Sequence, residues 1–190
     1  MFTWINSLFL TLAVSGCVAT GPTDVGPGIM RILGGAMVAA VPQGYCLDPK
    51  SLHSERGGAV VIGGRCAASR PVPAAAITIS IGADGSSAVL KSGARVLTEW
   101  ARSPGGRAAL SRDGQPGSVV IRETLVADGA FLIRLEDRAV GPYWRAAIGL
   151  NGRLVMISVS APEGGALSLA EGRKILSGVV ETMRRANPAT

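Results

Sequence analysis

Alternating apolar and polar positions predict a β-strand near the middle of the chain. Residues 77–81 are Ile-Thr-Ile-Ser-Ile, so the isoleucines share one face and the two hydroxyl side chains share the other. A period of two residues is typical of a strand that buries one face in the core.

Two later segments form a predicted β-hairpin. Residues 118–126 and 131–136 are rich in apolar and β-branched residues, and they flank an Asp-Gly dipeptide at 128–129. Asp-Gly tolerates the positive φ angles of a two-residue type I′ turn. Such a turn places Glu123 opposite Arg134, a cross-strand ion pair worth less than about 1 kcal/mol that helps to set the register.

A second hairpin is predicted from residues 143–150 and 153–160, which flank Asn-Gly at 151–152. This dipeptide is one of the strongest short-range signals for a hairpin turn. Its register predicts an apolar face with two cross-strand pairs, Ile148 with Val155 and Trp144 with Val159. The two hairpins together predict four antiparallel strands in sequence.

Helical periodicity predicts an amphipathic helix between residues 86 and 103. Its apolar face consists of Val89, Val96, Leu97 and Trp100, and a basic stripe on the opposite face consists of Lys91, Arg95 and Arg102. Pro and Gly then predict a loop over residues 103–117.

A last helix is predicted to begin after Ser168, which forms a capping box with Glu171. Basic residues at 184–185 suit its negative C-terminal end, and Asn-Pro at 187–188 stops it. The expected apolar stripe is Leu169, Ile175, Leu176, Val179 and Met183. The order of elements predicts an α+β fold: a mostly antiparallel sheet of about six strands with a middle helix and a C-terminal helix packed on it.

The N-terminus has the composition of an export signal. Residues 2–16 carry no charged side chain, and small residues stand directly before Cys17. The run is shorter than the roughly 20 apolar residues that span a bilayer. Residues 14–17, Val-Ser-Gly-Cys, resemble the bacterial lipobox, whose cysteine accepts a lipid, although the usual basic n-region is missing because the first basic side chain is Arg31. A plain secreted protein and a buried N-terminal helix are the alternatives.

The predicted organisation is a signal peptide at 1–16, a lipidated flexible tether at 17–28 and a single α+β domain at 29–187. Val18 stands where an inner-membrane retention signal usually carries Asp, which favours a periplasmic protein anchored in the outer membrane through lipid on Cys17. All 19 basic and 13 acidic side chains lie beyond the signal, so the mature chain keeps the net charge of +6.

Cys46 and Cys66 remain once Cys17 carries lipid, and two thiols in an exported chain are expected to form a disulfide. The bridge would restrict the unfolded chain by about 3 kcal/mol. A redox pair, or a metal site with His53, the one histidine, is the alternative. Redox cysteines usually stand closer together and metal sites need more ligands, so the disulfide is favoured and His53 is expected in a solvated loop or short helix.

The order of elements over residues 36–187 resembles the PsbP-like fold of photosystem extrinsic subunits and several bacterial surface lipoproteins. The segments Gly-Tyr-Cys at 44–46 and Val-Val-Ile-Gly-Gly-Arg-Cys at 60–66 are also similar to a group of secreted bacterial proteins that brings no activity with it. Proteins of the PsbP-like type mostly bind macromolecules or lipids, so the resemblance implies a non-catalytic binding protein.

Motifs for catalysis are missing from the sequence. It contains no G-x-S-x-G elbow, zinc-protease motif, P-loop or dinucleotide-binding glycine pattern, and a single histidine weakens any catalytic triad. We therefore expect no enzyme activity, no cofactor and no metal. Positive charge alone would permit nucleic-acid binding, but an exported chain seldom meets nucleic acid and no stacking-aromatic motif accompanies the charge.

The leading hypothesis is a non-catalytic, lipid-anchored envelope protein that binds a protein partner or an anionic envelope component. The alternatives are a periplasmic carrier or sensor that holds a small apolar ligand between the sheet and the terminal helix, and an envelope hydrolase. The candidate partner-binding residues are Lys91, Arg95 and Arg102, with Tyr143 and Trp144 as possible aromatic anchors, although aromatic residues at such positions more often belong to the core.

Overall fold

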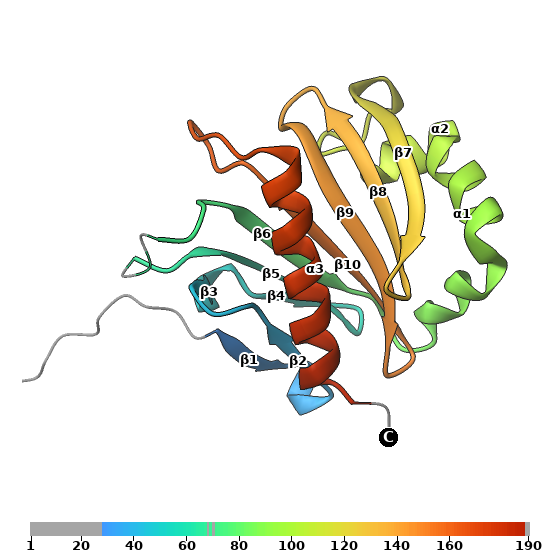
Figure 1. Cartoon of the computed structure of the whole chain (residues 1–190). Helices are drawn as coiled ribbons and strands as arrows, with labels where there is room; N and C mark the ends of the chain where they lie inside the picture. The colour runs from blue at the N-terminus through green and yellow to red at the C-terminus, as the bar shows by residue number, and fades with distance from the viewer. Residues whose placement is uncertain (1–27, 68, 70, 189–190) are drawn as a thin grey trace, which may run out of the picture.

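The computed structural model describes residues 28–67, 69 and 71–188. They form an α+β arrangement in which one large antiparallel sheet carries helices on both sides (Figure 1). This confirms the predicted fold class. The predicted signal peptide, Cys17 and the tether up to residue 27 lie outside the described residues.

Ten strands are present in the described part of the chain. They are β1 (Ile29–Ile32), β2 (Met37–Ala40), β3 (Tyr45–Leu47), β4 (His53–Glu55), β5 (Gly58–Arg65), β6 (Ala76–Ile81), β7 (Val119–Ala127), β8 (Ala130–Asp137), β9 (Gly141–Leu150) and β10 (Arg153–Ser160). β1 pairs with β2, and the other strands form one sheet in the order β3-β5-β6-β10-β9-β8-β7, with β4 also beside β5.

Both predicted hairpins are confirmed. The turn residues Asp128 and Asn151 have φ angles of 51° and 47°, and the glycine after each also has a positive φ, as type I′ turns require. The register pairs Glu123 with Arg134, Ile148 with Val155 and Trp144 with Val159, as expected. The Arg134 Nε lies 3.1 Å from Glu123 Oε2.

The C-terminal helix α3 (Leu169–Ala186) covers one face of the sheet (Figure 1). Its capping box is present: the Ser168 hydroxyl accepts from the Glu171 amide, and the Glu171 carboxylate accepts from the Ser168 amide. Four of the five predicted stripe residues are buried, and Leu169 is half-buried. The inward positions of β5, β6, β9 and β10 pack against this helix and form the main core.

The predicted middle helix is present, but it is shorter than predicted. Residues 86–103 form a 3₁₀ helix η3 (Ser86–Ser92) followed by α1 (Gly93–Arg102), and the two are separated because Gly93 adopts a φ of 82°. The predicted loop contains a further helix, α2 (Pro104–Leu110), and a 3₁₀ turn at Pro116–Ser118. Ser103 caps α2 by accepting from the Gly106 amide, and Pro104 occupies its first position, two local signals that favour a helix start.

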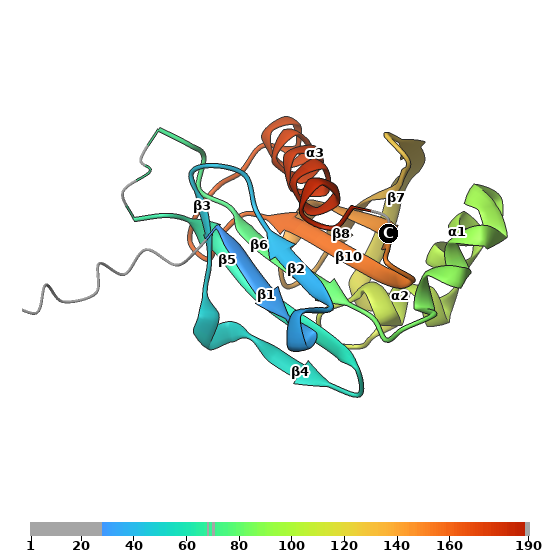
Figure 2. The same ribbon diagram turned by 90° about the horizontal axis from the view of Figure 1, so that it is seen from below.

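Figure 2 shows α3 and the pair α1–α2 on different sides of the sheet. The α1–α2 pair packs on β7, β8 and β9 through Leu97, Ala101 and Leu110, which form a second core with Phe131 and Ile133. This core is smaller than the one below α3, because α1 and α2 cover only the β7 end of the sheet face opposite α3. The β5–β6–β10 part of the same face is left partly open, and this opening positions the candidate site.

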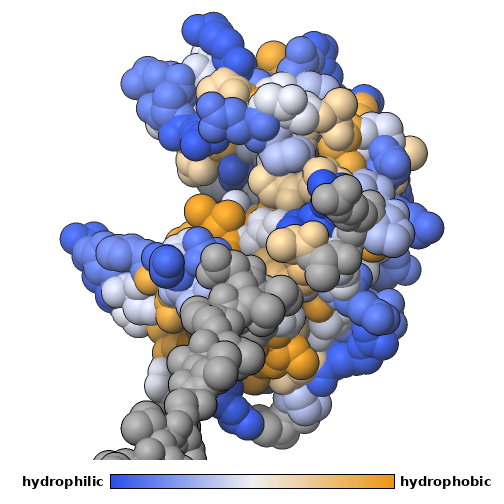
Figure 3. All heavy atoms as spheres, turned by 90° about the vertical axis from the view of Figure 1, so that its left-hand side faces the viewer, coloured by the Kyte–Doolittle hydropathy of each residue, from blue (hydrophilic) through white to orange (hydrophobic). Residues whose placement is uncertain are grey.

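Surface hydrophobicity is broken up on the side viewed in Figure 3, where apolar residues lie in patches between polar projections. Such a distribution differs from a single broad apolar interface. Within the described residues, none of the helices has the length and apolar character to cross a membrane.

Candidate functional site

The strand alternation decides what faces the open side of the sheet. On β6 and β10, the isoleucines and valines enter the core below α3, whereas Thr78, Ser80, Ser158 and Ser160 occupy the alternate positions and are half-buried. On β9 the same face carries Arg145. The open face is therefore polar in its centre and apolar beside α1.

Strand register aligns these side chains in a transverse row. Arg145 of β9 pairs with Ser158 of β10, Ser158 pairs with Thr78 of β6, and Thr78 pairs with Ile62 of β5. In the adjacent row, Ser80 of β6 pairs with Met156 of β10, and Met156 pairs with Ala147 of β9. The side chains in this row therefore change from a hydroxyl on β6 to apolar groups on the strands nearer α1. Register thus brings residues of four strands onto one surface, although Ile62 and Ser158 are 96 positions apart in the sequence.

An apolar cavity of about 360 Å³ lies between this surface and the helices η3, α1 and α2. Its walls are Ser80, Val89, Leu90, Leu97, Trp100, Ala109, Leu110, Phe131, Ile133, Arg145, Ala147, Leu154 and Met156. We call this space the apolar cavity. Its size falls in the range of about 300–1,000 Å³ that is typical of small-molecule sites.

A second space of about 410 Å³ adjoins the cavity along the uncovered strands. We call it the hydroxyl cleft. It is lined by Ile62, Ala76, Thr78, Ser80, Arg112, Val140, Tyr143, Arg145, Met156, Ser158 and Ser160. Ser80, Arg145 and Met156 line both spaces, so the cavity and the cleft meet at Arg145 and together form what we call the Arg145 site.

The guanidinium of Arg145 is only partly solvated and has no ion partner among the described residues. Its Nε is buried and forms no hydrogen bond within this part of the chain. Its Cζ lies 5.5 Å from the centroid of the Tyr143 ring, a cation–π distance. A charged group in this state gains more from an incoming anion than a fully hydrated one does.

Tyr143 stays protonated at neutral pH. Burial raises the pKa of its phenol, the positive charge of Arg145 opposes that rise, and the negative charge of Asp137 adds to it. Asp137 is itself buried, and its carboxylate accepts the backbone N–H groups of Arg112 and Ala139. The cleft therefore contains two arginines and a neutral phenol, and none of the described residues lining it is acidic.

Tyr143 and Trp144 are core residues, the alternative that the sequence favoured over surface anchors. Each is only 4% exposed, because β9 is a central strand between β8 and β10, and Trp144 belongs to the core below α3 while Tyr143 belongs to the second core. Trp144 faces α3, donates to the carbonyl of Leu169 and lies 5.1 Å from the guanidinium carbon of Arg173. Tyr143 faces the other way and lines the hydroxyl cleft.

The predicted basic stripe of Lys91, Arg95 and Arg102 is exposed. Arg95 forms an ion pair with Glu99 one turn later, with Nη1 and Oε1 2.8 Å apart. The opposite, apolar face differs from the prediction: only Leu97 is buried, while Trp100 is 45% exposed. The reason is that α1 packs at the β7 end and leaves the cavity beneath it, so Val89 and Trp100 border a space instead of filling a core.

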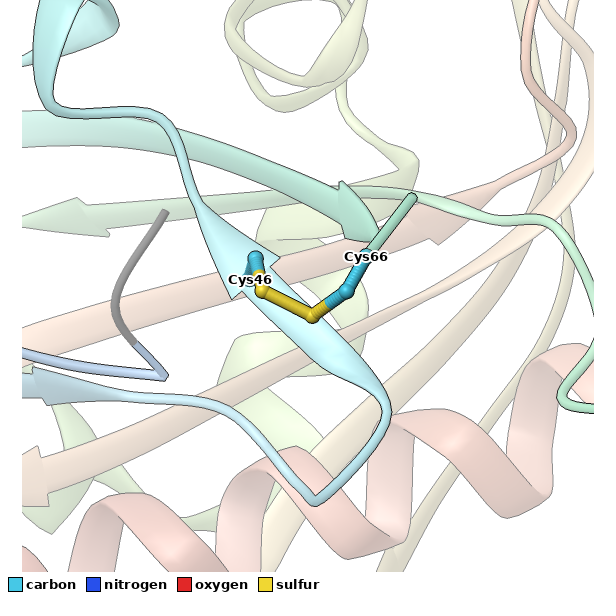
Figure 4. Close-up of a disulfide and its surroundings, with 2 residues drawn as sticks. All are labelled: Cys46 and Cys66. Atoms are coloured by element: carbon cyan, nitrogen blue, oxygen red, sulfur yellow. A yellow bond between two sulfur atoms is a disulfide. The ribbon is translucent and has the colours of Figure 1, made fainter. Parts of the chain in front are cut away.

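Cys46 on β3 and Cys66 directly after β5 form the predicted disulfide (Figure 4), with Cα atoms 5.1 Å apart. The bridge removes both thiolates from any metal site with His53. His53 is part of β4 and not of a loop or short helix, because it pairs with Val60 at the edge of β5. Its side chain is 74% exposed, 3.7 Å from Glu55. The described residues contain no group of three or more potential metal ligands.

The alternative hypothesis of a carrier or sensor placed a small apolar ligand between the sheet and α3, but the groove there has a different character. It measures about 590 Å³ and is lined near the β7–β8 turn by Asp128, Lys174, Glu181, Arg184 and Arg185 together with smaller residues. Charges of both signs make it less suited to an apolar ligand than the cavity beneath α1.

Arg145 itself was not predicted as a site residue, although Tyr143 in the hydroxyl cleft and Trp100 in the cavity wall were both singled out from the sequence. One local signal existed: Arg145 is a charged residue within an otherwise apolar strand, at a position in phase with Tyr143. The hydroxyl residues were assigned only to the polar face of their strands. Their alignment with Arg145 depends on the pairing of β6 with β10. These strands are separated by the 71 residues between Ile81 and Arg153, and no turn signal joins them.

No protein-family model and no curated protein matches this chain. A crystal structure of a protein from Bacteroides thetaiotaomicron VPI-5482 was matched with a TM-score of 0.34 and 12% sequence identity. The match covers 76% of this chain and 45% of that chain, so it spans less than half the length of the Bacteroides protein. A TM-score this low carries no argument, and the resemblance to the PsbP-like fold stays a prediction.

Proposed function

We propose that the protein is a non-catalytic binding protein of the bacterial cell envelope, anchored through lipid on Cys17, that holds a small ligand at the Arg145 site. The function is that of a carrier or sensor. The observation that carries it is the position of Arg145 at the junction of the apolar cavity and the hydroxyl cleft, with a buried Nε that has no partner among the described residues.

Two physical features favour binding over a purely structural role. Leaving a charged donor buried and unpaired costs stability, on the order of 1–3 kcal/mol or more. An open space lined by Trp100, Phe131 and Met156 forgoes the packing that a filled core would provide. Sites of this composition, mostly apolar with a few polar groups, are the usual form of small-molecule pockets.

The envelope location is supported by the Cys46–Cys66 disulfide, because such bridges persist in oxidising compartments. The intact mass of membrane-extracted protein tests it. A chain that begins at Cys17 with added acyl mass, and gains about 2 Da on reduction of one disulfide, is the expected result. A full-length unacylated chain with free thiols would contradict the anchored location.

Ligand binding is tested with N-phenyl-1-naphthylamine, a neutral apolar dye that fluoresces on transfer from water to an apolar site. We expect saturable binding that quenches Trp100, the half-exposed tryptophan at the cavity wall. Ala109→Phe inserts a ring at the exposed rim of the cavity and should weaken dye binding at least about tenfold. Ala170→Phe, at an exposed position on α3, is the matched control and should leave it unchanged.

A docking role for the basic stripe is the second candidate, favoured by the exposure of Lys91, Arg95 and Arg102 beside Val96, which is 40% exposed. Such a surface suits an acidic protein or an anionic polymer. The test is salt-sensitive association with isolated envelopes. Charge reversal at Lys91 and Arg95 should abolish it, and unchanged association would rule out the stripe as a docking surface.

A further inference from the structure

We infer that the ligand of the Arg145 site is a single-chain amphiphile whose head group is an oxyanion, a carboxylate or a phosphate monoester. This inference rests on the proposed function and names the chemical class that the site takes. The head lies in the hydroxyl cleft against Arg145, and the chain extends into the apolar cavity beneath α1.

Charge complementarity places the head. The cleft contributes two guanidinium groups, Arg145 and Arg112, and its described lining includes no carboxylate. Ser158 and Thr78 follow Arg145 across the sheet, and each hydroxyl can donate one hydrogen bond to an oxygen. Guanidinium and hydroxyl donors along one row suit an acceptor with several oxygens, which carboxylates and phosphates provide.

The apolar cavity places the chain. Beyond Arg145, its walls are aliphatic and aromatic, with Leu97, Trp100, Phe131 and Met156 among them. A volume of about 360 Å³ is at the small end of ligand sites, which suits one alkyl chain better than the two chains of a membrane phospholipid. Because Ser80, Arg145 and Met156 border both spaces, a ligand can occupy them together without breaking the protein surface between them.

A neutral apolar ligand fits the observations less well. It would fill the cavity but further desolvate the Arg145 guanidinium without supplying a partner, which is unfavourable for a charged group. A small polar ligand such as a sugar would use the hydroxyl cleft and leave the cavity empty. Only an amphiphile with an anionic head satisfies both halves of the site.

Three ligands with the same ten-carbon chain separate these possibilities: decanoate, decyl phosphate and decanol. The two acids are used below their micelle concentrations and decanol is used below its solubility limit. Affinities are measured on the mature chain by displacement of the naphthylamine dye and by calorimetry. We expect decanoate, decyl phosphate or both to bind at least about tenfold more tightly than decanol, the typical minimum for a hydrogen-bonded charge. The tighter of the two acids identifies the carboxylate or the phosphate source.

Arg145→Gln tests the residue itself. We expect it to weaken binding of the preferred acid at least about tenfold without weakening the binding of decanol, which no longer has to desolvate a charged group. Arg134→Gln is the matched control, because Arg134 is a half-buried arginine on the neighbouring strand that already pairs with Glu123. It should leave all three affinities unchanged. Circular dichroism of both variants establishes that they are folded.

The outcomes separate this inference from the proposed function. If decanol binds as tightly as both acids, or if Arg145→Gln weakens all three ligands equally, the oxyanion inference is wrong while ligand binding stands. If no ligand displaces the dye and Ala109→Phe has no effect on dye binding, the proposed function itself is wrong. Selective binding of an acid that depends on Arg145 supports both.

Discussion

The side chain of Asn187 bonds to both backbone groups of Val38, a residue 149 positions earlier in the chain. Its Oδ1 accepts the Val38 N–H at 2.9 Å, and its Nδ2 donates to the Val38 carbonyl at 2.8 Å. The same Nδ2 donates to the carbonyl of Met183 in the last turn of α3. The C-cap of the terminal helix therefore holds the β1–β2 hairpin in place.

Asn187→Ala should lower the free energy of unfolding by about 1–3 kcal/mol, because Asn187 is only 5% exposed and both Val38 groups would lose their partner. Urea unfolding followed by circular dichroism measures the change. Asn187→Asp keeps the acceptor but turns a buried carboxylate oxygen toward the carbonyls of Val38 and Met183, so at neutral pH it should destabilise the protein at least as much as Asn187→Ala. Equal stability of all three proteins would contradict the bridging role.

Gly106→Ala should destabilise the α1–α2 corner by about 1–3 kcal/mol and reduce dye binding at the Arg145 site. A Cβ at Gly106 would overlap the backbone carbonyl of Trp100, so α1 would have to move. Gly105→Ala is the matched control: a Cβ there meets no atom within 4 Å, and stability should be unchanged or slightly raised. Thermal unfolding and dye titration of both variants check this, and equal behaviour of the pair would refute it.

Removal of the disulfide should lower the free energy of unfolding by about 3 kcal/mol, because Cys46 and Cys66 are separated by 20 positions and the bridge restricts the unfolded chain. The double variant Cys46→Ser, Cys66→Ser is compared with the oxidised protein in guanidinium unfolding. The midpoint should shift to lower denaturant without loss of dye binding, because no residue of β3 or β5 lines the apolar cavity. A shift in wild type reduced by dithiothreitol should match that of the variant.

Stability should decrease at acidic pH in part through Glu171. Hydrogen bonds from the Ser168 hydroxyl and backbone lower the pKa of Glu171 below its ordinary value of 4.5. A depressed pKa in the folded state means that the stabilisation is complete above 4.5 and is lost as the pH falls through the lower, folded value. Glu171→Gln should therefore make the free energy of unfolding less dependent on pH below pH 5. Glu163→Gln, in an exposed loop, should leave the pH profile as in wild type.

Local signals predicted much of the fold correctly. Asp-Gly and Asn-Gly turns set the register of two hairpins as far as Glu123–Arg134 and Trp144–Val159, because a two-residue turn leaves a single pairing. The capping box of α3 and the pairing of the two remaining cysteines also follow from residues alone. The break at Gly93 and the helix after Ser103 were missed, although a glycine and a Ser-Pro start are local signals.

These local signals could not predict the Arg145 site. An alternating strand shows which side chains share a face, so Thr78 and Ser158 were correctly separated from the core residues beside them. It does not show which strand lies next to it, and the row from Arg145 to Ile62 exists only because β6 pairs with β10 and β5.

The sequence by itself therefore determined the two hairpins with their registers, the C-terminal helix and the disulfide, all of which depend on neighbours in the chain or on the small number of possible partners. Tertiary structure alone decided between the core and the anchor alternatives for Tyr143 and Trp144, placed α1 over a cavity and placed Arg145 at the mouth of that cavity. The physical reason is that exposure and cavities depend on how fully distant elements cover one another. Coverage is a property of packing in three dimensions and is not encoded in any short stretch of residues.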